Sequence, residues 1–123
     1  MDLRQLILAE DIERLDTLTD GGEHVEDPID GMSPVEFAVT HERWDAALKL
    51  VDNGAPLREK RCRGKPIFHC VAAEGPASLV VAMLDNGANE NAVDEAGNTP
   101  LEVAERAGRT DVANLLRARG AVD

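Results

Sequence analysis

Aromatic side chains are almost missing from this sequence. Of its 123 residues, only Phe37, Trp44 and Phe68 are aromatic, and tyrosine is absent. Because β-strands favour aromatic and β-branched residues, this scarcity argues against a β-sandwich. Hydrophobic residues still make up 43% of the chain, and a core rich in Leu, Ala and Val fits packed helices better.

Cysteine, basic charge and long hydrophobic runs are scarce as well. Two cysteines, Cys62 and Cys70, are too few for a disulfide framework, so we expect reduced thiols and a cytoplasmic location. No basic leader with a long apolar segment and no run of about 20 apolar residues occurs, which predicts neither a signal peptide nor a membrane span. The net charge of −11 argues against nucleic acid and anionic membranes as partners.

Glycine, in contrast, recurs with a regular spacing. Two series share a period of 33 residues, Gly31, Gly64 and Gly97 in one and Gly54, Gly87 and Gly120 in the other. Two series with the same period predict a tandem repeat. At the end of the first repeat, Gly21 keeps this period, whereas Gly22 aligns the helices better, and both remain open.

The last repeat carries clear helix signals. Thr99 is a predicted N-cap, Pro100 follows at the first helical position, and Glu102 completes a capping box. Ser33, Pro34 and Glu36 predict a second capping box, in the second repeat. Gly108 separates this helix from a second one, whose apolar stripe is Val112, Ala113, Leu115 and Leu116. The pattern predicts a helix–turn–helix unit that cannot bury its apolar face alone.

These residues resemble the ankyrin repeat. The run 94–101 nearly matches the family's D-x-x-G-x-T-P-L, the run 31–36 matches more loosely, and 52–55 and 85–89 match the closing segment. The resemblance implies an all-α fold, an α-solenoid of stacked helix–turn–helix repeats with short hairpin-like fingers. We expect a single domain, 1–123, made of an N-terminal capping repeat (1–30), two repeats (31–63 and 64–96) and a C-terminal capping repeat (97–123).

The resemblance also implies a function, which is protein–protein recognition on the concave surface formed by fingers and first helices. Carried over by position, the variable contact residues are Asp30, Met32, Thr40, His41, Cys62, Arg63, Lys65, Ala73, Glu74, Glu95, Asn98 and Arg106. We expect a monomer without catalytic activity or cofactor that binds a protein partner.

The second finger, residues 55–65, is unusually basic. Five of the chain's thirteen basic residues lie within eight positions, namely Arg58, Lys60, Arg61, Arg63 and Lys65. One interpretation is a partner-contact site, because arginine can bind carboxylates with two parallel hydrogen bonds. The other is neutralisation by the acidic fingers on either side. Trp44 is a further candidate anchor, although a core position suits it better.

The sequence offers little support for a catalytic site or a metal-binding site. His69 and Cys70 are adjacent, so on a helix they point about 100° apart, and no Cys-x-x-Cys spacing suggests zinc. Cys70 falls on a predicted core position. His69 matches the family's histidine, which implies a structural bond within the helix-capping turn. We predict neither an enzyme nor a metal site.

Two narrower roles are open. A small acidic binder could be an inhibitor or immunity protein that neutralises a bacterial toxin or enzyme, and the excess of arginine over lysine fits a GC-rich source. A structural scaffold or assembly module is the other alternative.

Overall fold

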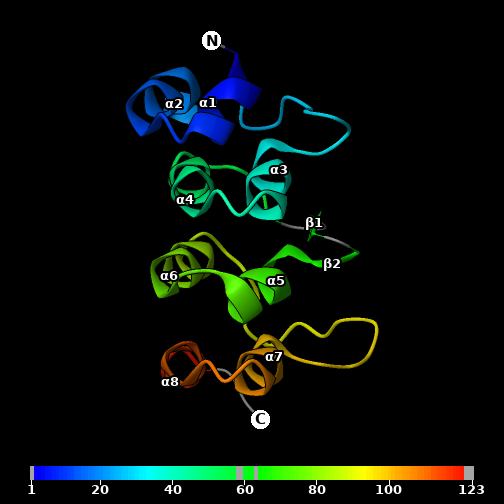
Figure 1. Ribbon diagram of the computed structural model, residues 1–123. Coiled ribbons are helices and arrows are strands. Elements are labelled where there is room, and N and C mark those ends of the chain that lie inside the picture. The colour runs from blue at the N-terminus through cyan, green and yellow to red at the C-terminus, as the bar shows by residue number, and fades with distance from the viewer. Residues whose placement is uncertain (1, 58–59, 63, 121–123) are drawn as a thin grey trace.

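The computed structural model describes residues 2–57, 60–62 and 64–120. These residues form four helix pairs stacked in chain order (Figure 1). The pairs are α1 (Leu3–Ala9) with α2 (Ile12–Thr19), α3 (Pro34–Thr40) with α4 (Trp44–Asp52), α5 (Ile67–Glu74) with α6 (Ala77–Asp85), and α7 (Pro100–Arg106) with α8 (Thr110–Ala118). The predicted all-α solenoid is confirmed.

The core runs without interruption between the pairs. The first helices α1, α3, α5 and α7 contact one another in order, and so do α2, α4, α6 and α8. Leu50, Leu79 and Leu116 on the second helices are fully buried, as are Val39 and Leu101 on the first. Each pair therefore buries its apolar face against its neighbours, as expected for a solenoid. None of the helices in the described ranges has the length and apolar character needed to span a bilayer.

The helix starts follow the capping signals. Ser33 and Thr99 cap α3 and α7 as predicted, each in a complete capping box with the glutamate three residues on. Asp2 caps α1 with Gln5 in the same way. Helix α5 is different, because it begins after Pro66 with no side-chain cap.

The repeated glycines adopt repeated conformations. The φ angles are 82°, 80° and 83° in the series Gly31, Gly64 and Gly97, and 96°, 98° and 100° in the series Gly54, Gly87 and Gly120. These left-handed values suit glycine, which has no Cβ. Between the paired helices, Glu10 and Glu42 share a left-handed conformation (φ 50° and 56°) and lie 32 residues apart. The same spacing joins Gly22 to Gly54, so the structure favours Gly22 over Gly21 as the end of the first repeat.

Three fingers project from the same side of the stack (Figure 1). In finger one (23–30), Ile29 and Met32 exchange backbone hydrogen bonds of 2.8 and 2.9 Å. Finger two (55–65) contains strand β1 (Arg61–Cys62), which pairs in antiparallel fashion with strand β2 (Lys65–Pro66) at the end of the finger. In finger three (88–96), the Asp94 carboxylate accepts the N–H groups of Ala96 and Asn98, both at 2.9 Å. After Asp20–Gly22 (η1), the chain enters finger one.

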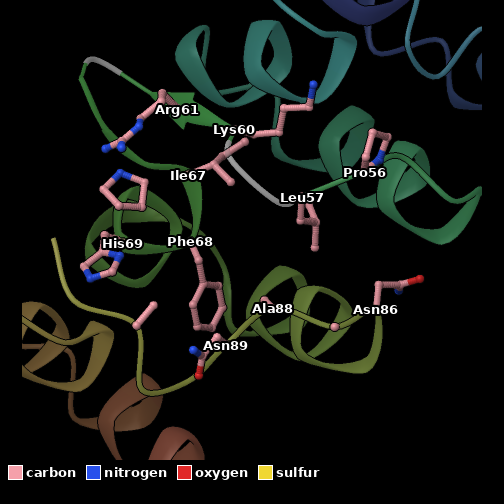
Figure 2. A pocket seen from close by; sticks show the side chains of 13 residues that line it. Pro56, Leu57, Lys60, Arg61, Ile67, Phe68, His69, Asn86, Ala88 and Asn89 are labelled. Atoms are coloured by element: carbon pink, nitrogen blue, oxygen red, sulfur yellow. The ribbon is translucent and has the colours of Figure 1, made fainter.

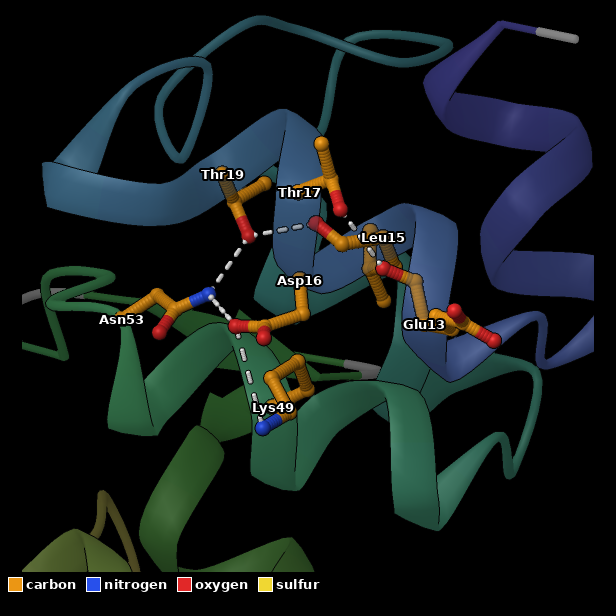
Figure 3. Close-up of polar contacts among 7 residues, drawn as sticks. All are labelled: Glu13, Leu15, Asp16, Thr17, Thr19, Lys49 and Asn53. Atoms are coloured by element: carbon orange, nitrogen blue, oxygen red, sulfur yellow. Dashed lines mark hydrogen bonds and ion pairs between the residues drawn. The ribbon is translucent and has the colours of Figure 1, made fainter.

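A polar network joins the first two pairs (Figure 3). The Asn53 amide donates to Asp16 Oδ1 at 3.0 Å and to Thr19 Oγ1 at 2.8 Å. Thr19, which is fully buried, donates in turn to the Leu15 carbonyl at 2.7 Å. Lys49 lies 3.8 Å from Asp16. Because these groups come from both α2 and α4, they fix the relative position of the two pairs.

Candidate protein-interaction surface

Exposed polar side chains gather at the ends of the first helices. His41 and Glu74 are exposed just where α3 and α5 end, and Arg106 is exposed at the end of α7. Thr40 and Ala73, one residue earlier on α3 and α5, are half-buried. We call His41, Glu74 and Arg106 the helix-end rim. Its members lie about one repeat apart, so consecutive pairs present them in a row.

The predicted finger positions differ in exposure. Lys65 and Glu95 are exposed, whereas Met32 and Asn98 are half-buried beside the starts of their helices. Asp30 is exposed and lies 3.5 Å from Arg4 on α1.

The basic cluster of finger two is visible only in part, because Arg58 and Arg63 lie outside the described residues. Of the other three, Arg61 and Lys65 are exposed and Lys60 is half-buried. Within the described ranges, none of these three forms an ion pair with a carboxylate of finger one or finger three. For these residues, the interpretation that neighbouring fingers neutralise the basic charge gains no support.

Glu36 ties finger two to the preceding helix pair. Its carboxylate accepts the Arg61 N–H at 2.6 Å and the Ser33 N–H at 2.9 Å. Burial works to raise the pKa of Glu36, but the hydrogen bonds from Arg61 and Ser33, with the nearby charge of Lys60, hold it below its ordinary value. The start of β1 is thus anchored by an ionised side chain.

Cys62 is not a contact residue, so that prediction was wrong. The two residues of β1 point to opposite sides, as strand geometry requires, which leaves Arg61 exposed and Cys62 only 1% exposed. The Thr40 hydroxyl donates to the Cys62 sulfur at 3.8 Å, and the Cys70 thiol donates to the Cys62 carbonyl at 3.1 Å. Trp44 is half-buried and packs against the hydrophobic core.

His69 links two repeats instead of closing its own capping turn. Its side chain is 1% exposed, and Nε2 donates to the Asn98 carbonyl at 2.8 Å. Glu36 holds the equivalent position one repeat earlier and also bonds to the backbone of the following finger. Hydrogen bonds from Asn98 and Ala96 hold the pKa of Asp94 below its ordinary value, with a smaller contribution from His69.

Val93 is a surface residue that sequence reasoning missed. It is 61% exposed, and no other large hydrophobic residue in the described part of the chain is exposed. It lies in finger three, one repeat after Lys60. The signal available in the sequence was a branched apolar residue in a finger that otherwise holds only alanine and polar residues.

The described residues contain no group of three or more His, Cys, Asp and Glu side chains arranged to hold a metal ion.

No family model matches this chain. Known proteins with similar sequences include two that are named as ankyrin repeat proteins and several spider latrotoxins. An ankyrin repeat protein of fowlpox virus is 28% identical over 87 residues, covering 71% of this chain and 60% of the viral protein. An ankyrin repeat-containing protein of Schizosaccharomyces pombe is 36% identical over 55 residues, 45% of this chain and 27% of the yeast protein. Alpha-latrotoxin-Lhe1a of Latrodectus hesperus is 35% identical over 74 residues, 58% of this chain but 5% of the toxin. The chain thus spans less than two thirds of each relative.

Proposed function

We propose that the chain is an ankyrin repeat protein and that it binds a protein partner through its fingers and the helix-end rim. The supporting observation is the contrast between a uniform core and a varied surface. Most core positions carry alanine, valine, leucine or isoleucine, whereas the rim carries His41, Glu74 and Arg106 on successive pairs. Varied side chains on a rigid, repeated frame provide specificity for one partner surface.

Charge narrows the kind of partner surface. Lys60, Arg61 and Lys65 concentrate positive charge on finger two of a chain whose net charge is −11. Finger three presents the apolar Val93 next to it. We infer a partner whose contact surface places carboxylates near finger two and an apolar patch near finger three, with Arg58 and Arg63 adding to the basic contact.

The test reverses charge on finger two. The double variant Arg61→Glu/Lys65→Glu should lose partner capture at least about tenfold, because a repulsive pair replaces an attractive one at each contact. Immobilised chain and mass spectrometry of captured proteins give the measurement, and far-UV circular dichroism confirms the fold. Arg14→Glu, on the second-helix side of the first pair, is the matched control and should capture as the wild-type chain does. Equal capture by all three proteins would remove finger two from the interface.

The two more specific roles, inhibitor or immunity protein and scaffold, predict different oligomeric states and different effects in cells. An inhibitor or immunity protein in the cytoplasm would act as a monomer and would protect cells that co-express the toxin or enzyme it binds. A scaffold would self-associate or bind two partners at once. Light scattering that shows a concentration-independent monomer would favour the first role, and absence of protection in a co-expression toxicity assay would count against it.

A further inference from the structure

Along the second helices, polar contacts between neighbouring pairs start from two positions that recur every 33 residues. The first position directly precedes a second helix. Before α4, the Arg43 side chain donates to the Leu8 carbonyl of α1 at 3.0 Å. Before α8, the Arg109 side chain donates to the Val71 and Ala72 carbonyls of α5, both at 3.4 Å. These arginines therefore join pair one to pair two and pair three to pair four.

The second position directly follows a second helix. After α4, Asn53 donates to Asp16 and Thr19 of α2 (Figure 3). After α8, Arg119 donates to Asp85 of α6 at 2.9 Å and forms an ion pair with it. The first and last junctions of the stack are thus each linked a second time.

The contact between pairs two and three, which we call the central junction, has neither link. Pro76 takes the first position and has no donor on its backbone or its side chain. Asn86 takes the second position, but its side chain donates to the Ala82 carbonyl of its own helix at 2.8 Å. Among the hydrogen bonds and ion pairs of the described residues, none joins α4 to α6. These two helices pack through buried apolar side chains.

The central junction is also less completely filled. A groove of about 710 Å³ opens there (Figure 2). Its lining comes from both pairs, because Leu57 follows α4, whereas Asn86 and Ala88 follow α6. Phe68, in the first turn of α5, lines it too. An open groove between two packed units leaves room for one to move relative to the other.

On the side of the fingers, in contrast, the central junction is held by hydrogen bonds. Glu36 on α3 accepts the Arg61 N–H at 2.6 Å, and Thr40 on α3 donates to the Cys62 sulfur at 3.8 Å. Strand β1, which carries both partners, pairs with β2 directly before α5. Hydrogen bonds are directional, whereas hydrophobic contacts are not. A junction with hydrogen bonds along one edge and apolar contacts along the other can therefore rotate about the bonded edge.

We propose that the central junction is a hinge, about which the stack bends as two rigid halves. Pairs one and two form one half, and pairs three and four form the other. The bonded edge at finger two is the axis, α4 and α6 move relative to each other, and the groove widens or narrows as they do. Fingers one and three belong to different halves, so bending changes the angle between them. This motion is a property of the free chain and requires no partner.

Nitroxide spin labels at matched positions measure the motion. The second residue of each second helix is exposed, namely Glu13, Asp45, Ser78 and Asp111. Replacing neighbours two at a time by cysteine gives three labelled full-length chains, each with one label on either side of one junction. Dipolar broadening of the electron paramagnetic resonance spectrum then reports the spread of distances between the labels. Mass spectrometry should find two labels per chain, because the native Cys62 and Cys70 are only 1% and 7% exposed.

We expect the spread across the central junction to be at least about twice that across the first or the last. Pro76→Arg/Asn86→Arg supplies the side chains that the last junction uses and should narrow the central spread. The converse variant, Arg109→Ala/Arg119→Ala, should widen the spread across the last junction. Far-UV circular dichroism confirms that each variant is folded. Equal spreads across all three junctions would overturn the hinge, and so would a last junction that Arg109→Ala/Arg119→Ala leaves unchanged.

Discussion

At the scale of the residue, Glu36 makes stability depend on pH. Its carboxylate joins α3 to finger two through Ser33 and Arg61, and these bonds lower its pKa from the ordinary value of 4.5 despite the opposing effect of burial. A group with a lowered folded-state pKa stabilises the fold fully above its unfolded-state pKa. That stabilisation is lost as the pH falls from about 4.5 through the lower value.

Replacing this carboxylate should remove the pH-dependent contribution. We expect Glu36→Gln to lower the free energy of unfolding by about 1 kcal/mol at pH 7, the size of a hydrogen bond to a charged group partly retained by the amide. Below the lowered pKa of Glu36, the free energies of unfolding of the variant and the wild-type chain should become equal. Urea denaturation at a series of pH values measures this, with Glu26→Gln on the exposed part of finger one as control. A constant difference across the whole pH range would contradict the role given to the charge.

At the scale of the element, helix starts are an independent source of stability. The Thr99 hydroxyl accepts the Glu102 N–H at 3.2 Å, whereas Thr110, at the first position of α8, is exposed and does not cap that helix. We expect Thr99→Ala to cost about 1 kcal/mol and Thr110→Ala much less. Chemical denaturation of the two variants makes a matched comparison, since both remove one threonine from the same repeat. Equal losses would show that the intrinsic helix propensity, and not the cap, decides.

A structural feature can be predicted from the sequence when the residues that form it are close together in the chain. Capping boxes and the turn glycines follow from residues at most a few positions apart, so Ser33, Thr99 and the two glycine series were predicted correctly. The inward direction of Cys62 depends on the register of a two-residue strand, which the repeat pattern does not specify. His69 finds its partner 29 residues away, in the next finger. No local signal in the sequence predicts such a contact.

At the scale of the whole molecule, stability is distributed along the stack. Among the described residues, the main contacts of each helix pair are with the pair before and the pair after it. Arg119 on the last pair reaches Asp85 on the preceding one at 2.9 Å, and Asn53 bonds back to Asp16, so polar contacts follow the same nearest-neighbour order. In such a chain, the position of a defect along the stack decides how much of the structure it affects.

Two substitutions that shorten core side chains should show whether structure is lost in one part of the stack or throughout it. Leu79 and Leu116 are both fully buried, but α6 packs on both α4 and α8, whereas α8 packs on α6 alone among the second helices described. Each change to alanine should cost roughly 2–5 kcal/mol. Hydrogen exchange followed by mass spectrometry should show Leu116→Ala losing protection in α7 and α8 while α3 and α4 keep theirs, because only one interface is weakened. Leu79→Ala should lower protection from α3 to α8, because it weakens the interfaces on both sides of the third pair. Equal loss of protection over all eight helices in both variants would mean that the stack unfolds as one unit, which would contradict a nearest-neighbour account of its stability.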